Sequence, residues 1–503
     1  TIFHFFSLIN LAIGLRRYGA IRSLASIELV PAWAPRFLRL FTFFIPHKKN
    51  IPETDGERLA AALARMGPAY IKLGQTLATR PDLVGRKLAE GLTTLQDRLP
   101  AFNYKQVETI IESELEGKID DIFDDFETIP VAAASIAQVH KAKLKDGTIV
   151  AVKVLRPDVE KRFTRDLALF EWLAELANNH IREARRLRLI EVVAKIKETS
   201  LKEMDLRLEA SAAVELEQNM EGELGYRIPS INWDLTSRRV LTLEWITGVR
   251  LNNKEALVKA GHNLKELGYR IIQIFLKQAM RDGYFHADLH QGNLLVEGDG
   301  TIVAIDFGIM GRLSKNDRRF LAEILFGFIS RDYKRVAEIH FDAGYVPYGQ
   351  SIEEFAQAMR VIADPIMDLP VEEISAGKLL AQLFATTERF SMRTQPQLLL
   401  LQRSMVMAEG LALHLNPQTN MWEISRPVIE DWMYDNLSPE VRLADAIVQI
   451  PRLVERLPMK LDQLLNKDLN DQNLNVIQPR KQSLLSFALG LIAGAAIIKI
   501  LFL

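Results

Sequence analysis

The stretch HADLHQGN at residues 286–293, followed after a short β-type segment by DFG at residues 306–308, decides the fold of this chain. Asp288 has the position of an aspartate that orients or deprotonates an attacking group, and Asn293 has the spacing of a magnesium ligand. Asp306 adds a second metal-binding carboxylate. A lone tripeptide is weak evidence because short motifs arise by chance, but the ordered set is specific. It predicts magnesium-assisted phosphoryl transfer.

The same loop has a second interpretation as a metal cluster. His286, Asp288 and His290 alternate along it and could bind a hydrolytic zinc ion. That interpretation leaves Asn293 and Asp306 unexplained. We therefore favour phosphoryl transfer and expect His286 to brace the loop behind the aspartate.

A lysine in the first half of the chain extends the pattern. Two strands are predicted at residues 139–144 and 148–154, with an Asp146-Gly147 turn between them. Lys153 lies late in the second strand, where its ammonium can reach the α- and β-phosphates of a nucleotide. The predicted hairpin therefore carries one part of a nucleotide site.

An alanine-rich segment precedes this hairpin, in the place of a phosphate loop. Its residues are Ala132, Ala133, Ala134, Ser135, Ile136, Ala137 and Gln138. Alanine restricts positive φ and close backbone approach, so the segment favours a stiffer or helical turn. We expect the amides of residues 135–138 to face the phosphates; the alternative is a plain packing turn.

Composition limits the other functions. The 503 residues suggest about three domains, or one large core with additions. Lys and Arg total 63 against 64 acidic residues, so the charge balance gives no support for broad nucleic-acid binding. The chain has no Cys, which excludes disulfides and thiolate metal sites. Any metal must bind oxygen or histidine.

The C-terminal residues 483–503 carry a membrane signal. The run SLLSFALGLIAGAAIIKILFL has a single charge, Lys499, and the length of a spanning helix. Arg480 and Lys481 precede it and put the main body on the cytoplasmic side. The alternative is a buried hairpin helix.

The first 50 residues repeat this theme more softly. Apolar and aromatic residues precede Arg16 and Arg17, and Glu28 is the single acidic residue of the segment. Such a segment suits an anionic membrane surface. A helix docked on the core is the equal alternative.

Three further segments carry a resemblance to a known family. GPAYIKLGQ at residues 67–75 contains a K-x-G-Q pattern, in which Lys72 and Gln75 share a helix face. AAASIAQVH at residues 132–140 replaces a glycine-rich loop, and EMD at residues 203–205 precedes RLEA at 207–210. From about residue 50 to about 430 the chain resembles the UbiB family of atypical kinase-like proteins.

The resemblance implies an α+β, kinase-like fold of two lobes with added N-terminal helices and a helical C-terminal lobe. The expected parts are a membrane-associated segment (1–50), a K-x-G-Q helical extension (51–127), an N-lobe (128–245), a helical C-lobe (246–435), a helical linker (436–482) and a transmembrane helix (483–503).

The resemblance also implies residue roles. Glu209 is the preferred ion-pair partner of Lys153, with Glu203 as the alternative, and both glutamates fit one long helix. Glu203 and Asp205 would meet the added helices that bear Lys72 and Gln75, as a regulatory contact. Residues 243–246 resemble the hinge between lobes, with backbone groups of Glu244 and Ile246 facing adenine.

The function implied is that of an ATP- and Mg²⁺-dependent phosphoryl-transfer enzyme at a bacterial inner membrane, or a mitochondrial-type equivalent. No A-P-E motif follows residue 308, and the added helices would cover a protein-docking surface, so ATPase activity supporting ubiquinone biosynthesis is favoured. Expected partners are ATP, membrane lipid, polyprenyl quinone intermediates and ubiquinone biosynthesis enzymes, with no nucleic acid. A true phosphotransferase for a protein or small molecule and a nucleotide-switched scaffold are the alternatives.

Overall fold

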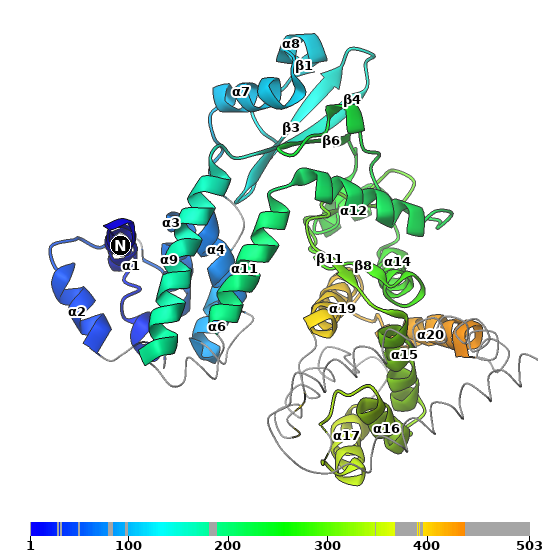
Figure 1. Cartoon of the computed structure of the whole chain (residues 1–503). Helices are drawn as coiled ribbons and strands as arrows, with labels where there is room; N and C mark the ends of the chain where they lie inside the picture. The colour runs from blue at the N-terminus through cyan, green and yellow to red at the C-terminus, as the bar shows by residue number, and fades with distance from the viewer. Residues whose placement is uncertain are drawn as a thin grey trace, which may run out of the picture. The chain divides into compact units, whose positions relative to one another are not determined.

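The computed structural model describes residues 2–27, 30, 33–48, 51–78, 84–95, 99–180, 189–347, 349–367, 390, 392 and 396–437. The chain divides into two compact units, Thr1–Glu430 and Asp431–Leu503. The site described below belongs to the first unit, as do all described helices and strands except the end of α20 (Met421–Leu437) (Figure 1). The predicted membrane helix at 483–503 and nearly all of the predicted linker before it lie outside the described residues.

Helices build the N-terminal part of the first unit. They are α1 (Ile2–Arg17), η1 (Ser23–Ser26), α2 (Trp33–Phe41), α3 (Asp55–Met66), α4 (Pro68–Ala78) and α6 (Arg86–Leu92). Thr54 and Glu57 form a capping box at the start of α3. Gly67 then turns the chain with φ 120°, and Pro68 begins α4 in a position that needs no backbone donor. Leu63 and Ile71 are buried in the shared core of these helices.

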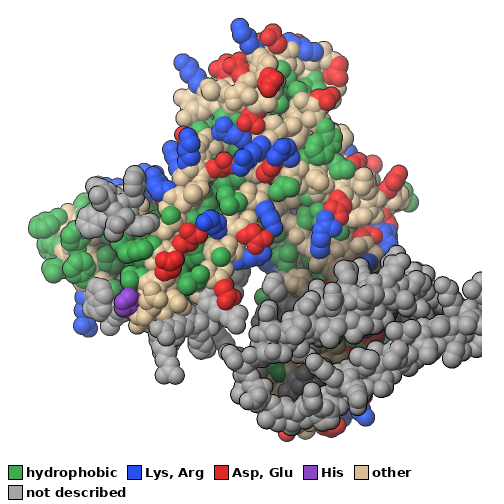
Figure 2. Space-filling model, viewed as in Figure 1, with side chains coloured by type: hydrophobic (Ala, Val, Ile, Leu, Met, Phe, Trp, Pro, Cys, Tyr) green, Lys and Arg blue, Asp and Glu red, His purple; other side chains and the backbone are tan. Residues whose placement is uncertain are grey.

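Of the two interpretations of the first 50 residues, a docked helix describes α1 and a membrane-surface segment suits α2. Leu15 of α1 and Ile21 just after it are buried in the core, so α1 is a docked helix. By contrast, Phe37 and Phe41 of α2 are more than half exposed, and Phe44 is 92% exposed. Hydrophobic side chains gather on this part of the surface (Figure 2).

The N-lobe is built on an antiparallel sheet in the order β1-β3-β4-β6, with β2 paired to β3. Its elements are α7 (Tyr104–Leu115), α8 (Ile119–Ile122), β1 (Phe123–Phe126), β2 (Ala132–Ala133), β3 (Ala137–Leu144), β4 (Ile149–Leu155), η2 (Trp233–Leu235) and β6 (Val240–Glu244). Because α7 packs on β4 and β6 and β1 pairs with β3, this lobe begins before residue 128, the predicted boundary. Gly147 takes φ 92° in the turn between β3 and β4, and Asp146 accepts a hydrogen bond from the amide of Thr148. The hairpin predicted from this turn is confirmed.

Three helices follow β4, namely α9 (Val159–His180), α11 (Leu189–Glu203) and α12 (Leu206–Asn219). α9 and α11 run side by side and both pack on α4 (Figure 1). The prediction that Glu203 and Glu209 share one helix is wrong. Asp205 is extended at φ −118° and caps α12, and the amide of Leu206 donates to the carbonyl of Arg238. The two glutamates therefore belong to separate helices.

The C-lobe is mainly helical and contains two small sheets, β5-β10-β9-β7 and β11-β8. Its elements are β5 (Tyr226–Arg227), β7 (Val249–Arg250), α13 (Lys254–Lys259), α14 (Leu264–Leu276), η3 (Lys277–Asp282), β8 (Tyr284–His286), β9 (Leu294–Val296), β10 (Ile302–Ala304), β11 (Met310–Arg312), α15 (Lys315–Ile329), α16 (Tyr333–Asp342), α17 (Ile352–Met367), α19 (Pro396–Leu415) and α20 (Met421–Leu437). The turns between these short strands carry residues 286–293 and 306–308.

One helix among the described residues, the Gln397–Leu415 part of α19, is long and apolar enough to cross a membrane by length and composition. Leu401, Ala408 and Leu411 of this helix are buried in the C-lobe core, where α19 packs on α14. The core position of this helix explains its apolar composition.

Candidate active site

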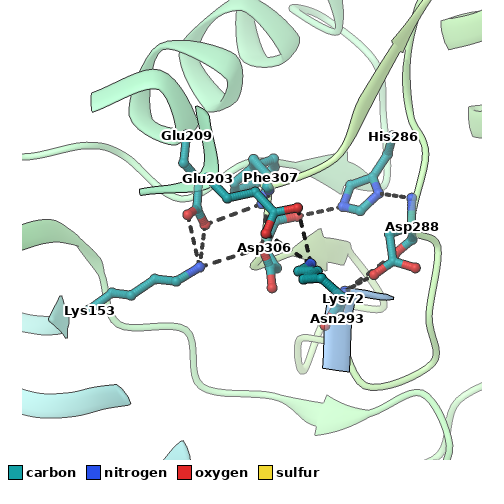
Figure 3. A network of polar contacts seen from close by, with 10 residues as sticks. Lys72, Lys153, Glu203, Glu209, His286, Asp288, Asn293, Asp306 and Phe307 are labelled. Carbon is teal, nitrogen blue, oxygen red and sulfur yellow. Dashed lines mark hydrogen bonds and ion pairs between the residues drawn. The ribbon is translucent and has the colours of Figure 1, made fainter. Parts of the chain in front are cut away.

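Lys153 lies between two carboxylates (Figure 3). Its Nζ is 2.7 and 2.9 Å from the two carboxylate oxygens of Glu209 and 3.5 Å from Oδ1 of Asp306. The side chains of Lys153 and Glu209 are 15% and 8% exposed, whereas that of Asp306 is 45% exposed. One cation and two carboxylates leave a net negative charge. The carboxylate that is accessible to a ligand is that of Asp306.

Electrostatic interactions keep Lys153 and Asp306 charged. Burial opposes the charge of Lys153, but the carboxylates of Asp306 and Glu209 outweigh it and raise the pKa of the lysine. The Lys153 ammonium in turn holds the pKa of Asp306 well below its ordinary value. Glu209 also accepts a hydrogen bond from the amide of Phe307 at 3.4 Å, which ties α12 to the DFG segment.

His286 joins the two segments that carry the aspartates. Its Nε2 donates to the backbone carbonyl of Asp306 at 2.5 Å, and its Nδ1 accepts from the amide of Asp288 at 3.1 Å. Burial lowers the pKa of His286, so the ring is neutral, with one donor and one acceptor as these bonds require. His286 braces the loop as predicted.

The zinc interpretation of this loop is wrong. Both ring nitrogens of His286 are already bonded, and Nδ1 of His290 accepts the amide of Gly292 at 3.0 Å. No group of three or more His, Asp or Glu side chains fit to hold a metal occurs within the described residues.

Asn293 lies beside Asp288. Its amide nitrogen is 3.3 Å from the carbonyl and 3.5 Å from Oδ2 of Asp288. Because the amide nitrogen faces Asp288, the side-chain amide oxygen of Asn293 points away from that residue. Oxygen is the atom that Mg²⁺ binds. The carbonyl of Asn293 accepts the amide of Ile305, so the asparagine lies next to the strand that leads to Asp306. An asparagine oxygen and an ionised, accessible carboxylate fit Mg²⁺, which typically binds one or two carboxylates together with substrate phosphates.

The alanine-rich segment forms a hairpin, so the prediction of a helical turn is wrong. Ala132 and Ala133 pair with β3, and the amide of Ala134 donates to the carbonyl of Ala137 at 2.8 Å. These bonds satisfy an extended backbone, which alanine adopts freely at negative φ. The tip of the hairpin is Ser135 and Ile136.

Two side chains of this segment point inward. Ser135 is 2% exposed and Gln138 is 1% exposed. Oε1 of Gln138 accepts the amide of Phe102 at 3.0 Å, and its Nε2 is 2.8 Å from the ring of His140. Because Gln138 also lies between β2 and β4 in the sheet, it is committed to the interior of the lobe.

The segment predicted as a hinge ends β6. The carboxylate of Glu244 accepts two hydrogen bonds of 2.9 Å from Arg227, which also donates two of 2.7 Å to Glu297. Ile246 is buried. The amide of Glu244 donates to the carbonyl of Ser230 at 2.9 Å and that of Trp245 to the carbonyl of Ile149 at 3.2 Å. Because these groups are committed, any contact of the segment with an adenine edge would involve its remaining backbone groups.

Two family models and many known proteins match this chain. The ABC1 atypical kinase-like domain matches residues 94–340, and the UbiB helical domain matches residues 359–420. A protein of Aliivibrio fischeri named probable protein kinase UbiB is 42% identical over 441 residues, which cover 86% of this chain and 81% of that protein. The chain belongs to the UbiB family. An Azotobacter vinelandii UbiB protein is 39% identical over 490 residues, 96% of this chain and 90% of its own.

A solved structure shares the fold. A Mycobacterium tuberculosis protein, determined as a complex with erythromycin, aligns with a TM-score of 0.52 at 23% identity. The alignment covers 73% of this chain and 93% of that one. It supports the kinase-like architecture of this UbiB chain.

The K-x-G-Q helix of this UbiB protein, α4, contacts the end of α11. Nζ of Lys72 lies 3.0 and 2.9 Å from the carboxylate oxygens of Glu203, and the two side chains are 16% and 10% exposed. Asp205 instead accepts two hydrogen bonds from the guanidinium of Arg207 and caps α12. Gln75 lies on α4, partly buried. Of the two acidic residues expected here, Glu203 pairs with the K-x-G-Q helix.

Sequence reasoning missed Arg403 of the UbiB helical region. Its Nη2 lies 3.6 Å from Oδ1 of Asp288, and 51% of its side chain is exposed. The signal in the sequence was a single charge within the run LLLLQRSMVM. That signal did not indicate a partner, because the partner lies in a distant segment.

Proposed function

We propose that this chain is a membrane-associated, magnesium-dependent ATPase of the UbiB family that supports ubiquinone biosynthesis. The observation that carries the proposal is the cluster of Lys153, Glu209 and Asp306. Its net charge is negative, and the accessible carboxylate bears it. Such a carboxylate beside a fixed cation suits a metal-bound nucleotide.

Asp306 and Asn293 would hold Mg²⁺, which when bound neutralises charge on the phosphates. Lys153, fixed by Glu209, would contact the phosphates through its ammonium. Asp288 would orient or deprotonate the attacking water, with its backbone held by His286. The tip of the alanine hairpin and the hinge backbone at Glu244 and Ile246 would contact the phosphates and adenine.

The short segment after DFG supports hydrolysis over protein phosphorylation. Residues 309–314 include β11, which pairs with β8, and α15 begins directly afterwards at Lys315. This leaves little chain for a peptide-docking segment. The pair between Lys72 and Glu203, which anchors α4 beside the helix leading to Glu209, supports a regulatory role for the K-x-G-Q helix.

Features of the N-terminal part support work at a lipid surface. The exposed aromatic residues of α2 alternate with exposed Arg36 and Arg39. A cavity of about 910 Å³ nearby is lined by Arg17, Arg65 and Arg165, among other residues. Cations beside apolar surface suit an anionic bilayer, and we extend this to a location at the bacterial inner membrane with a cytoplasmic body and polyprenyl lipid clients.

The test is phosphate release by the full chain in neutral detergent with added lipid, with and without Mg²⁺. Asp306→Asn and Lys153→Ala are expected to reduce it by roughly a hundredfold or more. The matched controls Asp299→Asn and Lys143→Ala change the same residue types at exposed positions outside the cluster and should behave as the wild type. Equal rates in all five proteins would refute the ATPase.

The names of the relatives favour a second candidate, a true kinase. Labelled γ-phosphate found on a protein or lipid, and not only as inorganic phosphate, would support it. A nucleotide-switched scaffold would instead bind ATP with no turnover, and cells carrying Asp306→Asn would retain normal ubiquinone.

A further inference from the structure

Arg156, the residue directly after β4, joins separate segments around the alanine-rich hairpin. Its guanidinium donates twice to the carbonyl of Ala134, from Nε at 3.0 Å and from Nη2 at 2.8 Å. Nη2 also donates to the carbonyl of Pro100 at 2.9 Å, and the backbone amide of Arg156 donates to Ile136 at 2.8 Å. The guanidinium lies 5.5 Å from the ring centroid of Phe102.

The segment held by Arg156 is itself bound to the hairpin. Oε1 of Gln138 on β3 accepts the amide of Phe102, two residues after Pro100. Residues 99–102 therefore touch the hairpin from two sides, at its turn through Arg156 and on its second strand through Gln138. This segment leads from the helical extension into the N-lobe.

The charge of Arg156 is not neutralised by a carboxylate in the described part of the chain, where its hydrogen-bond partners are backbone carbonyls. Burial, with Arg162 adding to it, lowers the pKa of Arg156, yet a guanidinium stays protonated at neutral pH. A partly buried cation without a counter-charge lowers the cost of bringing an anion to the neighbouring turn.

The hairpin needs an external anchor. β2 is two residues long and pairs with β3. A strand of this length contributes little stability of its own. The segment contains no glycine that would let it close over a ligand after binding. The lack of glycine limits the conformations open to the turn, and a planar guanidinium with two donors on the carbonyl of Ala134 restricts it further.

We propose that Arg156 is a positioning residue for the phosphate chain of the nucleotide. It fixes the turn at Ser135 and Ile136 relative to Lys153, which lies three residues earlier in the chain. Backbone amides at the tip of such a turn bind phosphate when they are held in place, and here the accessible tip residue is Ile136, because Ser135 is buried. This inference rests on the nucleotide site of the proposed function.

A positioning role and a purely structural role predict different losses of affinity for nucleotides with different numbers of phosphates. Loss of a general brace would weaken the binding of every nucleotide and lower stability. Loss of a phosphate-positioning residue would weaken ATP strongly, ADP less, and AMP or adenosine hardly at all. The affinity ratio of ATP to AMP is therefore the decisive quantity.

The experiment measures the affinities of the full chain in neutral detergent for Mg-ATP, Mg-ADP, AMP and adenosine by titration calorimetry. Arg156→Gln is expected to weaken Mg-ATP about tenfold and AMP less than about twofold, the loss of one set of charge-assisted bonds. Arg156→Lys keeps the charge but has one compact donor group, so it should recover only part of the loss.

Arg238→Gln is the matched control, because Arg238 lies in the same lobe, is half-exposed and pairs with Glu160. It should leave all four affinities unchanged. Phe102→Leu removes the ring beside the guanidinium and should give a smaller loss with the same dependence on phosphate number. Phe102→Leu and Arg156→Lys carry the test if Arg156→Gln does not fold.

Three results would overturn the inference: unchanged Mg-ATP affinity in Arg156→Gln, an equal loss for Mg-ATP and AMP, or wild-type affinity in Arg156→Lys. A wild-type chain that binds no Mg-ATP would instead refute the proposed function. The two failures are thus separable.

Discussion

Arg403 lies against Asp288, with 3.6 Å between Nη2 and Oδ1. The arginine comes from α19 and the aspartate from the loop after β8, so the contact joins the UbiB helical region to the site. About half of the arginine side chain is exposed, which makes the pair weak as a source of stability. Its value lies in the orientation of the Asp288 carboxylate.

Replacing Arg403 should therefore affect turnover more than folding. Arg403→Gln is expected to lower phosphate release at saturating ATP by roughly three- to tenfold, because Asp288 loses a partner that restricts its rotation. The free energy of unfolding should change by less than about 1 kcal/mol. Steady-state phosphate release and urea unfolding measure the two effects. The exposed Arg319→Gln serves as a control, and a large loss of stability without loss of turnover would contradict the prediction.

Asp306 should contribute to stability in a defined pH range. Lys153 lowers the pKa of Asp306 to about 2, below its value in the unfolded chain. This contribution is present above the unfolded pKa near 4 and is lost as the pH falls from about 4 to about 2. Because Asp306 is nearly half exposed, the effect should be at most about 1 kcal/mol. The difference in unfolding free energy between wild type and Asp306→Asn should shrink across that range; a constant difference would contradict it.

Local chemistry made part of the fold predictable from sequence. The β3–β4 hairpin follows from an Asp146-Gly147 turn between two β-type segments, and such signals act over a few residues. The spacing of Asp288 and Asn293 is likewise local. The contact between Lys153 and Glu209 was expected because of the resemblance to UbiB proteins, since no local pattern joins residues so far apart.

Tertiary contacts decided what the sequence did not reveal. The break between α11 and α12 has no Gly or Pro; it occurs where the amide of Leu206 leaves the helical pattern for the carbonyl of Arg238. Ala132 and Ala133 are extended because β3 pairs with them, although alanine favours helices. Arg403 reaches Asp288 because α19 packs on α14. Each outcome depends on a partner far away in the chain.

Close helix packing in the extension gives a graded prediction for two glycines, Gly91 and Gly74. A Cβ on Gly91 would lie 2.4 Å from the Cα of Gly56, and one on Gly74 would lie 2.4 Å from a terminal carbon of Leu95. The first clash is with backbone and the second with the end of a flexible side chain. Gly91→Ala should therefore cost more than about 3 kcal/mol and Gly74→Ala about 1–3 kcal/mol.

Gly410, on α19, is the control for these two variants, because a Cβ there meets nothing within 4 Å. Gly410→Ala should be neutral or stabilising by up to about 1 kcal/mol through helix propensity. Urea unfolding followed by circular dichroism gives the order. A Gly91→Ala protein as stable as Gly410→Ala would show that the α3–α6 crossing tolerates separation.

His340 should make the C-lobe sensitive to mild acid. It is buried beside Phe355, with 5.1 Å between ring centroids, and its Nδ1 is 2.8 Å from the carbonyl of Val336. Burial lowers its pKa to about 4, against the opposing effect of that hydrogen bond. A folded-state pKa below the unfolded value near 6.5 means that the neutral ring supports the fold above pH 6.5. This support is lost as the pH falls toward 4, by on the order of 3 kcal/mol.

His340→Phe keeps an aromatic ring but cannot titrate, so the stability difference between wild type and variant should fall by that amount between pH 7 and pH 4. Parallel curves for wild type and His340→Phe would exclude His340 as the acid-sensitive group.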